Sequence, residues 1–253
     1  MAAGDGRAVL VTGASRGIGR AIARAFAARG DRVAVHWGSS RERAEHVLAE
    51  LPGSGHTLVR ADMTDADQVA GMVDEAAGAL GGIDVLVNNA GVFTAHPPLS
   101  TSYDDWQAAW TQTLATNLVG AANATFRAVP HLIAAGGGAV VNVSSRGAFR
   151  GEPDNPAYGA SKAGLNAFAQ SMALVLAPHG ISVTCVAPGF VQTEMARAVL
   201  DGPGGDGVRA QSPFGRVARP EEVAAAVLFL ASPEARFSSG TIVDVNGASY
   251  LRS

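Results

Sequence analysis

The amino-acid sequence predicts a single α/β domain built on a doubly wound parallel sheet. Short runs of Val, Ile and Leu alternate with helical stretches along the whole chain, which is typical of parallel strands joined by right-handed crossovers. The runs are apolar throughout rather than alternating with polar residues, as expected for strands covered on both faces. A chain of 253 residues suits one domain of this class, so residues 1–253 are predicted to form one unit.

About seven strands are expected. The first, 8–11, is an apolar run that ends at Thr12 and Gly13. The others are 33–35, 57–59, 85–87, 139–143, 181–186 and 241–245. Because the strands are predicted to be parallel, their carboxyl ends meet at one edge of the sheet, where a ligand of such a fold binds.

The helical stretches carry apolar residues three and four positions apart. They are expected at 17–29, 41–51, 65–80, 103–113, 114–135, 156–177 and 221–230. Five of the seven residues 201–207 are Gly or Pro. This composition predicts a mobile loop there rather than a linker between domains.

Composition excludes several classes of protein. The single cysteine, Cys185, rules out an intrachain disulfide framework. The formal net charge of −3 argues against a nucleic-acid or anionic-membrane partner, because both call for a basic excess. Residues 164–193 carry no charged side chain but are interrupted by Pro178, so they are not a membrane helix. We expect a cytoplasmic protein with no metal site.

The basic residues are unevenly distributed between the two types, with 18 Arg and a single Lys, Lys162. An ammonium group is a compact point charge whose pKa shifts readily on burial, whereas a guanidinium is not. Lys162 is therefore a candidate for chemistry, and chance is the alternative.

A glycine-rich loop follows the first strand and opens the first helix. It reads Thr12-Gly13-Ala14-Ser15-Arg16-Gly17-Ile18-Gly19, a G-x-x-x-G-x-G spacing. Glycines allow the backbone to approach a pyrophosphate, which then lies at the positive end of the helix. An ordinary strand-to-helix turn is the alternative. The position at the first strand–helix junction favours a dinucleotide site.

The end of the second strand favours NADP(H) over NAD(H). A carboxylate there would accept hydrogen bonds from the adenosine 2′-hydroxyl and repel a 2′-phosphate, but the sequence after Val35 is His36-Trp37-Gly38-Ser39-Ser40-Arg41. Guanidinium and hydroxyl donors such as those of Arg16, Ser39, Ser40 and Arg41 suit a phosphate.

A tyrosine and a lysine, Tyr158 and Lys162, are spaced to stand on one helix face, one turn apart. A nearby positive charge is expected to lower the phenol pKa toward the range of a general acid or base. Ser145, at the end of the fifth strand, offers a hydroxyl to a carbonyl oxygen, and strand alternation points either Ser145 or Ser144 away. Asn117, on the preceding helix, is a candidate to hold a water molecule.

Through these motifs the chain resembles the short-chain dehydrogenase/reductase family over essentially its whole length. The residues that carry the resemblance are Thr12-Gly13-x3-Gly17-x-Gly19, Asp62, Asn88-Asn89-Ala90-Gly91, Asn117, Ser145, Tyr158-x3-Lys162, Pro188-Gly189-x3-Thr193 and Asp244-x-x-Gly247. The resemblance implies a Rossmann-like fold and transfer of a hydride between a nicotinamide cofactor and a carbonyl or alcohol.

The resemblance also implies residue roles. Tyr158 would exchange a proton with the substrate oxygen, Lys162 would lower its pKa and hold the nicotinamide ribose, and Ser145 would orient the carbonyl. Asn117 would hold a water in a proton relay, and residues 193–215 would form a substrate lid. The cofactor-binding set is Gly13, Ser15, Arg16, Gly17, Ile18, Gly19, Trp37, Ser39, Asp62, Met63, Asn89, Ala90, Gly91, Tyr158, Lys162, Pro188, Gly189, Val191 and Thr193.

Three functions remain open from the sequence. An NADP(H)-dependent reductase of ketones or 3-oxoacyl groups is favoured over an NAD(P)-dependent sugar or polyol dehydrogenase, and over a non-catalytic dinucleotide sensor or scaffold. Docking of an acyl-carrier protein is doubtful, because the helix ends at 135–138 and 178–180 lack basic residues. The resemblance implies a homotetramer with helices 114–135 and 156–177 at one interface.

Two further features bear on the substrate. Arg146 and Arg150 either meet an anionic substrate or lie in a solvated loop. Apolar residues suggest room for a hydrophobic ketone, or belong to the core or a subunit interface: Trp106, Trp110, Phe149, Phe190, Met195, Val199 and Leu200.

Overall fold

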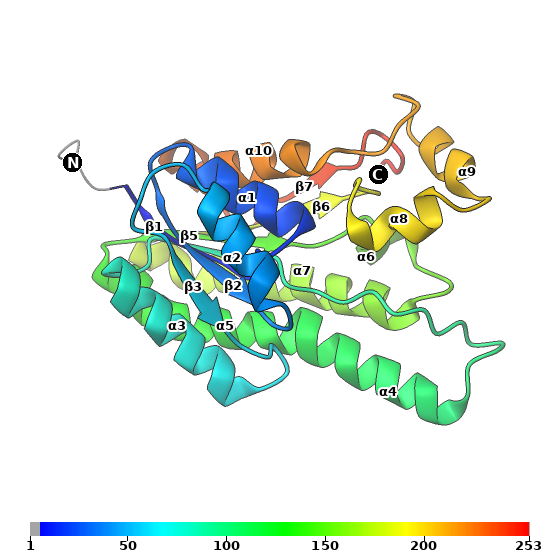
Figure 1. Ribbon diagram of the computed structural model, residues 1–253, viewed down its shortest axis with the longest axis horizontal. Helices are drawn as coiled ribbons and strands as arrows, with labels where there is room; N and C mark the ends of the chain where they lie inside the picture. Colours follow the sequence, from blue (N-terminus) through cyan, green and yellow to red (C-terminus); the bar gives the residue numbers. More distant parts are fainter. Residues whose placement is uncertain (1–5, 253) are drawn as a thin grey trace.

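The computed structural model describes residues 6–252. Seven parallel strands form one sheet in the order β3-β2-β1-β4-β5-β6-β7, with helices on both faces (Figure 1). The strands are β1 (Ala8–Val11), β2 (Arg32–Trp37), β3 (Thr57–Arg60), β4 (Val85–Asn88), β5 (Gly138–Val143), β6 (Ile181–Pro188) and β7 (Ile242–Val245). The predicted fold class and the seven predicted strands are confirmed.

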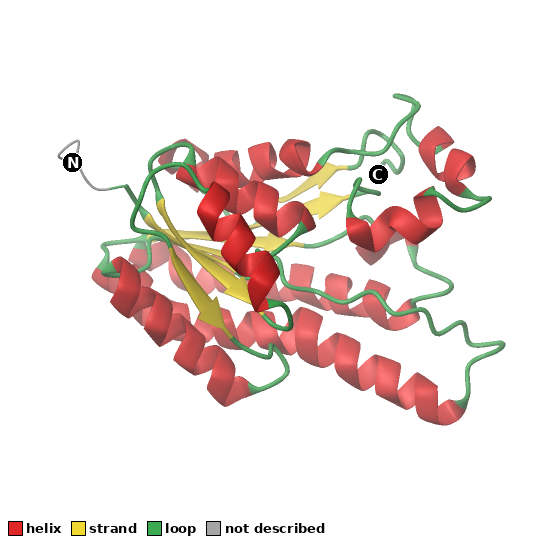
Figure 2. Ribbon diagram, in the orientation of Figure 1, coloured by secondary structure: helices red, strands yellow, loops and turns green. Residues whose placement is uncertain are grey.

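Ten α-helices lie in residues 6–252 (Figure 2). They are α1 (Gly17–Ala27), α2 (Arg41–Glu50), α3 (Ala66–Leu80), α4 (Tyr103–Leu114), α5 (Gly120–Ala134), α6 (Gly147–Arg150), α7 (Pro156–Leu176), α8 (Glu194–Leu200), α9 (Gly205–Ala210) and α10 (Pro220–Leu230). Two 3₁₀ turns, Ala177–His179 and Pro233–Ser238, follow α7 and α10. None of the helices in this part of the chain is long and apolar enough to cross a membrane.

Both faces of the sheet are covered, which explains the uniformly apolar strands. On one face α1, α2 and α10 bury residues such as Phe26 and Val47 against the strands. On the other face α3, α5 and α7 do the same with residues such as Met72 and Leu132. Burial of apolar area on both sides of each central strand stabilises the sheet by roughly 25 cal/mol per Å².

Two features differ from the sequence prediction. The chain from Tyr103 to Ala134 is helical throughout, and a π-helical turn at Ala115–Val119 joins α4 to α5. Residues 201–207, predicted to be a loop, contain the first turn of α9. The periodic patterns missed the short helices α6, α8 and α9, because segments of four to seven residues carry too few apolar positions to show a period.

The order of the strands determines where a ligand can bind. The chain runs outward from β1 to β3 on one side and from β4 to β7 on the other. The helices that follow β1 and β4 therefore cover opposite faces of the sheet and leave a crevice beyond the carboxyl ends of these strands. The polar residues predicted as the site follow these strand ends.

Candidate active site

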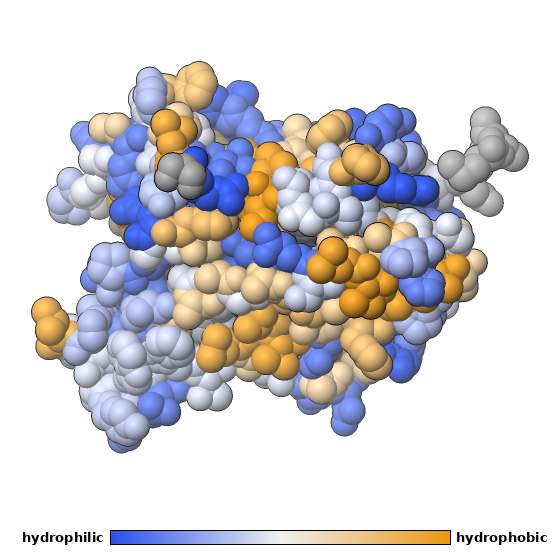
Figure 3. Space-filling view, turned by 180° about the vertical axis from the view of Figure 1, so that it is seen from behind, coloured by the Kyte–Doolittle hydropathy of each residue, from blue (hydrophilic) through white to orange (hydrophobic). Residues whose placement is uncertain are grey.

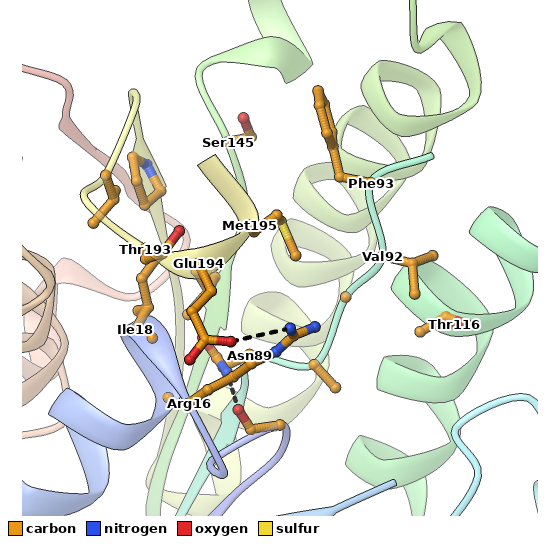
Figure 4. Close-up of a pocket in the computed structure, with 18 of the residues that line it drawn as sticks. Arg16, Ile18, Asn89, Val92, Phe93, Thr116, Ser145, Thr193, Glu194 and Met195 are labelled. Atoms are coloured by element: carbon orange, nitrogen blue, oxygen red, sulfur yellow. Dashed lines mark hydrogen bonds and ion pairs between the residues drawn. The ribbon is translucent and has the colours of Figure 1, made fainter. Parts of the chain in front are cut away.

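A cleft with a volume of about 530 Å³ lies at the carboxyl ends of the strands. Residues from the loop after β1, the ends of β3 and β4, α7 and the segment after β6 line it (Figure 4). Every residue predicted for the catalytic or cofactor-binding set lines this cleft except Trp37 and Asn117. The fold therefore brings the predicted residues, apart from these two, together in one cleft.

The glycine-rich loop adopts the backbone conformation that its sequence requires. Gly13 and Gly17 have positive φ angles of 64° and 53°, which side chains rarely allow. A Cβ on Gly19 would lie 2.2 Å from the carbonyl oxygen of Gly13, so only glycine fits there. Helix α1 begins at Gly17 and has no side-chain cap, which leaves its N-terminus suited to an anion such as a pyrophosphate.

A partly buried hydrogen-bond network connects this loop to the end of β4. The Thr12 hydroxyl accepts from the backbone N–H groups of Asn89 and Ala90, at 2.9 and 3.0 Å. The Asn89 amide donates to the carbonyl oxygens of Thr12 and Gly13, at 2.9 and 3.1 Å. Because these bonds involve backbone groups of both segments, they hold the loop in place.

His36 holds the same loop from the opposite side. Its Nδ1 accepts from the backbone N–H of Gly13 at 2.9 Å, so its Nε2 carries the proton and donates to the carbonyl oxygen of Ala61 at 3.1 Å. Burial lowers the pKa of His36 to about 4, which keeps the ring neutral. Sequence reasoning missed this residue and selected its neighbour Trp37, although successive side chains of a strand point in opposite directions.

The prediction for Trp37 is not supported by its position. Its ring packs against the hydrophobic core beside α1 and α2, and the Arg60 guanidinium lies 5.2 Å from its centroid. Arg60, Ser39 and Asp62 line the cleft instead. The Asp62 carboxylate accepts from the backbone N–H and the hydroxyl of Thr64, at 2.9 and 2.8 Å.

The arginines after β2 point in different directions. Arg41 pairs with Glu45 one turn along α2, at 2.8 Å. Arg43 instead reaches Glu194, the first residue of α8, at 3.1 Å. Arg16 approaches the same carboxylate oxygen of Glu194 at 3.8 Å (Figure 4).

Tyr158 and Lys162 lie on α7, one turn apart, as their spacing predicts. The Lys162 Nζ donates to the carbonyl oxygen of Val143, at the end of β5, at 2.8 Å, and lies 5.7 Å from the centroid of the Tyr158 ring. Phe93 packs edge-on against the same ring, with centroids 4.7 Å apart. The phenol is thus held between α7, β5 and the segment after β4.

The pKa of Tyr158 differs from the sequence expectation. Burial raises the pKa of the phenol, and a hydrogen bond from Ser145 opposes that rise. Burial lowers the pKa of Lys162 to about 8. Desolvation therefore outweighs the expected effect of the lysine charge on the tyrosine, because a buried site disfavours the charged form of both groups. A neutral phenol at pH 7 is a proton donor.

The two serines at the end of β5 differ as strand alternation predicts. Ser145 is partly exposed beside Tyr158, and its hydroxyl oxygen accepts from the backbone N–H of Gly147 at 3.0 Å. Ser144 is buried, with its hydroxyl directed at the carbonyl oxygen of Lys162 at 3.4 Å. Ser145 is the residue whose hydroxyl is available to a substrate.

Asn117 lies behind the wall of the cleft, within the π-helical turn. Its Oδ1 accepts from the backbone N–H of Val92 at 2.8 Å. Its Nδ2 donates to the carbonyl oxygen of Val92 at 3.0 Å and to the Ser161 hydroxyl at 3.2 Å. π-turns inside helices are frequent at functional sites, and this one turns the Asn117 amide onto the segment that faces Lys162.

Part of the cleft lining is apolar. Phe93, Phe190, Met195 and Val199 contribute to it, and Glu152, which the sequence did not single out, also lines the cleft. Burial raises the pKa of Glu152. The remaining apolar candidates, Trp106, Trp110, Phe149 and Leu200, do not line the cleft.

The two arginines after Ser145 have separate surroundings. Arg146 is buried, donates to the Ser249 hydroxyl at 2.6 Å and lies 5.4 Å from the centroid of Phe190. Arg150 is exposed and donates to Gln211, beyond α9, at 3.3 Å. Arg146 therefore supports the wall of the cleft, and Arg150 contacts the segment predicted as the lid.

Comparisons with known proteins agree with this geometry. Residues 13–248 match the family model described as Enoyl-(Acyl carrier protein) reductase. The chain is 42% identical over 243 residues to the cis-4-hydroxycyclohexanecarboxylate dehydrogenase of Sinomonas cyclohexanicum, covering 95% of both chains. It is 37% identical to the 3-oxoacyl-[acyl-carrier-protein] reductase FabG of Staphylococcus aureus, covering 97% of this chain and 98% of the relative.

A solved structure shows the same fold. It is a short-chain dehydrogenase from Burkholderia cenocepacia in complex with NADP, with a TM-score of 0.88 and 37% identity. The match covers 97% of this chain and 98% of the other. The fold, the cleft and these relatives together show that the chain belongs to the short-chain dehydrogenase/reductase family and is an NAD(P)-dependent oxidoreductase.

Proposed function

We propose that this enzyme transfers a hydride between NADP(H), in preference to NAD(H), and a ketone or secondary alcohol. The observation that carries the proposal is the placement of Ser145, Tyr158 and Lys162 at one end of a cleft whose other end is the glycine-rich loop. A nucleotide lying along the cleft would bring its nicotinamide to the tyrosine. The dehydrogenase and reductase names of the relatives give no support to a non-catalytic sensor.

The residues present fit a dinucleotide. The loop offers the uncapped start of α1 to the pyrophosphate, and Asp62, Ser39 and Arg60 surround the adenosine end. When bound, the nicotinamide supplies the hydride. The protein's part is to fix the carbonyl and to supply the proton.

Each catalytic side chain has one task in this proposal. Ser145 donates a hydrogen bond to the carbonyl oxygen and stabilises its developing negative charge. Tyr158, a phenol whose pKa is raised further by burial, donates its proton to that oxygen. Lys162, anchored at Val143, provides positive charge beside the phenol and binds the nicotinamide ribose. Asn117 orients the Val92 segment and supports a water-mediated path to Lys162.

Charge at the adenosine end supports the preference for NADP(H). The end of β2 carries no carboxylate, and Arg16 lines the cleft. Arg43 points to the same place, as its contact with Glu194 shows. Two guanidinium groups form strong charge-assisted hydrogen bonds with a phosphate.

The apolar part of the cleft lining favours an uncharged or hydroxylated ketone with an apolar body. Its apolar residues accept a ring or alkyl chain, and Glu152 accepts hydrogen bonds from a hydroxyl. The buried Arg146 lines the cleft and donates one hydrogen bond to Ser249. Sugar or polyol oxidation remains the alternative, because the same residues catalyse both directions. Residues 193–215, which carry α8 and α9, are proposed as the lid.

We also propose that the enzyme is a homotetramer. The outer surfaces of α5 and α7 expose Phe126 and Leu174, at 78% and 81%, together with Val175 at 60%. Hydrophobic residues gather in a band across the lower half of the face opposite that of Figure 1 (Figure 3). Exposed apolar patches of this kind mark interfaces. Light scattering of the purified protein should give four chain masses, and a monomer mass would contradict this proposal.

Titration of the purified enzyme with NADPH and with NADH, followed by activity with a ketone panel, tests the function. Nicotinamide fluorescence should show tighter binding of NADPH, and cyclic and aromatic ketones should be reduced at its expense. Equal or tighter binding of NADH would contradict the cofactor preference and direct the search to alcohols and polyols.

A further inference from the structure

Glu194 lies where the proposed cofactor phosphate would be expected. One of its oxygens, Oε2, is 3.1 Å from Nη1 of Arg43 and 3.8 Å from Nη1 of Arg16. These arginines come from two different elements, the glycine-rich loop and α2. A single carboxylate oxygen between two guanidinium groups marks a position where both can hold an anion.

The same glutamate is the first residue of α8. The residue before it, Thr193, packs against the loop, since a Cβ placed on Gly17 would lie 3.3 Å from its Cγ2. The start of the lid is therefore attached to the phosphate-binding side of the cleft by one packing contact and two ion pairs, of which Figure 4 shows the pair between Arg16 and Glu194.

Another anion can replace the Glu194 carboxylate in these two ion pairs at little cost in free energy. The side chains of Arg16, Arg43 and Glu194 are 50%, 51% and 45% exposed. Ion pairs at such exposure contribute little to stability, because water screens the charges and two long side chains lose freedom. A phosphate brings more negative charge and more acceptor oxygens than a carboxylate, so it can replace Glu194 between the two arginines.

We propose that Glu194 is an internal competitor for the 2′-phosphate of the cofactor and thereby couples cofactor identity to the lid. NADP(H) displaces the carboxylate from Arg16 and Arg43 and releases the start of α8. NAD(H), which has no 2′-phosphate, leaves the pairs in place. This inference rests on the proposed preference for NADP(H) and adds a selectivity residue and a coupling that the preference alone does not contain.

Affinity measurements with single variants test the competition. Glu194→Gln should bind NADPH about two- to fivefold more tightly, the range that an exposed ion pair accounts for, and should bind NADH as the wild type does. Arg43→Ala should weaken NADPH binding about tenfold, as expected for a lost charge-assisted contact. Arg20→Ala is the matched control, because Arg20 is also a partly exposed arginine paired with a glutamate, Glu50, but does not line the cleft, and it should change neither affinity.

Hydrogen exchange tests the coupling to the lid. In the wild type, amides of residues 194–200 should exchange faster with saturating NADPH than with saturating NADH, and Glu194→Gln should abolish this difference. Equal exchange with the two nucleotides, or a Glu194→Gln variant that binds NADPH no more tightly, would overturn the proposal.

The wild-type affinities separate this inference from the proposed function. If the wild type binds both nucleotides equally and Glu194→Gln then prefers NADPH, the competition stands and the proposed wild-type preference fails. If the wild type prefers NADPH and Glu194→Gln leaves that preference unchanged, the competition fails and the proposed function stands.

Discussion

The floor of the cleft and its rim are built in different ways. On the floor, Thr12, His36 and Asn89 are each bonded to backbone groups of a neighbouring strand end or loop. At the rim, Arg43, Glu194 and Arg150 are partly or largely exposed and contact other side chains across loops. Backbone-anchored buried contacts are costly to break, whereas exposed side-chain pairs rearrange at little cost.

The difference indicates how chemistry and selectivity are divided in this enzyme. A fixed floor keeps the reacting groups in one geometry whatever is bound, which proton and hydride transfer require. A rim that rearranges easily can distinguish nucleotides and substrates without disturbing that geometry. Variants of the two regions should therefore affect different quantities.

The largest effect is expected from Tyr158→Phe. Loss of the proton donor should lower kcat for ketone reduction by roughly 10²–10⁴-fold, while NADPH affinity stays within about twofold, since the ring remains packed against Phe93. Steady-state rates and fluorescence titration measure the two quantities. Tyr103→Phe is the control, because Tyr103 is 76% exposed on α4. A Tyr158→Phe enzyme with near-normal turnover would contradict the assigned role.

The dependence of folding stability on acidic pH tests the buried His36 contact in the floor of the cleft. The pKa of His36 falls from 6.5 to about 4 on folding, so the unfolded chain binds more protons between these values. Stability should therefore fall as the pH drops from 6.5 to 4, by up to about 3 kcal/mol from this residue. Urea unfolding across this range measures it, and His36→Asn should flatten the slope. His179→Asn, at an exposed site, should keep the wild-type slope. An unchanged slope in His36→Asn would count against the neutral buried ring.

The rate of ketone reduction at alkaline pH tests whether the charge of Lys162 is required. With a pKa of about 8, its amine is charged below that pH and neutral above it. Reduction should therefore decline above pH 8, approaching tenfold per pH unit, and kcat/KM for NADPH reports this free-enzyme pKa. Tyr158 stays protonated in that range, since burial raises its pKa. A flat profile through pH 9.5 would show that the lysine charge is not required.

The smallest effect is expected at the rim position Arg150. Arg150→Ala removes one exposed contact to Gln211, and such substitutions change free energies by about 0.5 kcal/mol or less. Rates with neutral and acidic ketones should both stay within about twofold. A selective loss on acidic ketones would instead support an anionic-substrate site.

The glycine-rich loop and the Ser145, Tyr158 and Lys162 group could be predicted from the sequence because their signals are local. The glycine spacing, the Tyr158–Lys162 interval and the serine at a strand end each require only a few neighbouring residues. Contacts at the rim depend on the tertiary fold. Arg43 and Glu194, for example, form an ion pair although they are 151 positions apart in the sequence. His36 was missed because the choice between it and Trp37 depends on the direction of alternation along β2, which no local signal gives.

A double-mutant cycle between a residue of the catalytic group and a residue of the rim tests the separation of chemistry from nucleotide selectivity most directly. Ser145→Ala, Glu194→Gln and the double variant would be compared by the ratio of kcat/KM with NADPH to that with NADH. We predict that Ser145→Ala lowers both values equally, and that Glu194→Gln raises the ratio by the same about two- to fivefold in either background, as for independent sites. A ratio that changes with Ser145→Ala, or a Glu194→Gln effect that differs between backgrounds, would contradict the separation of chemistry from selectivity.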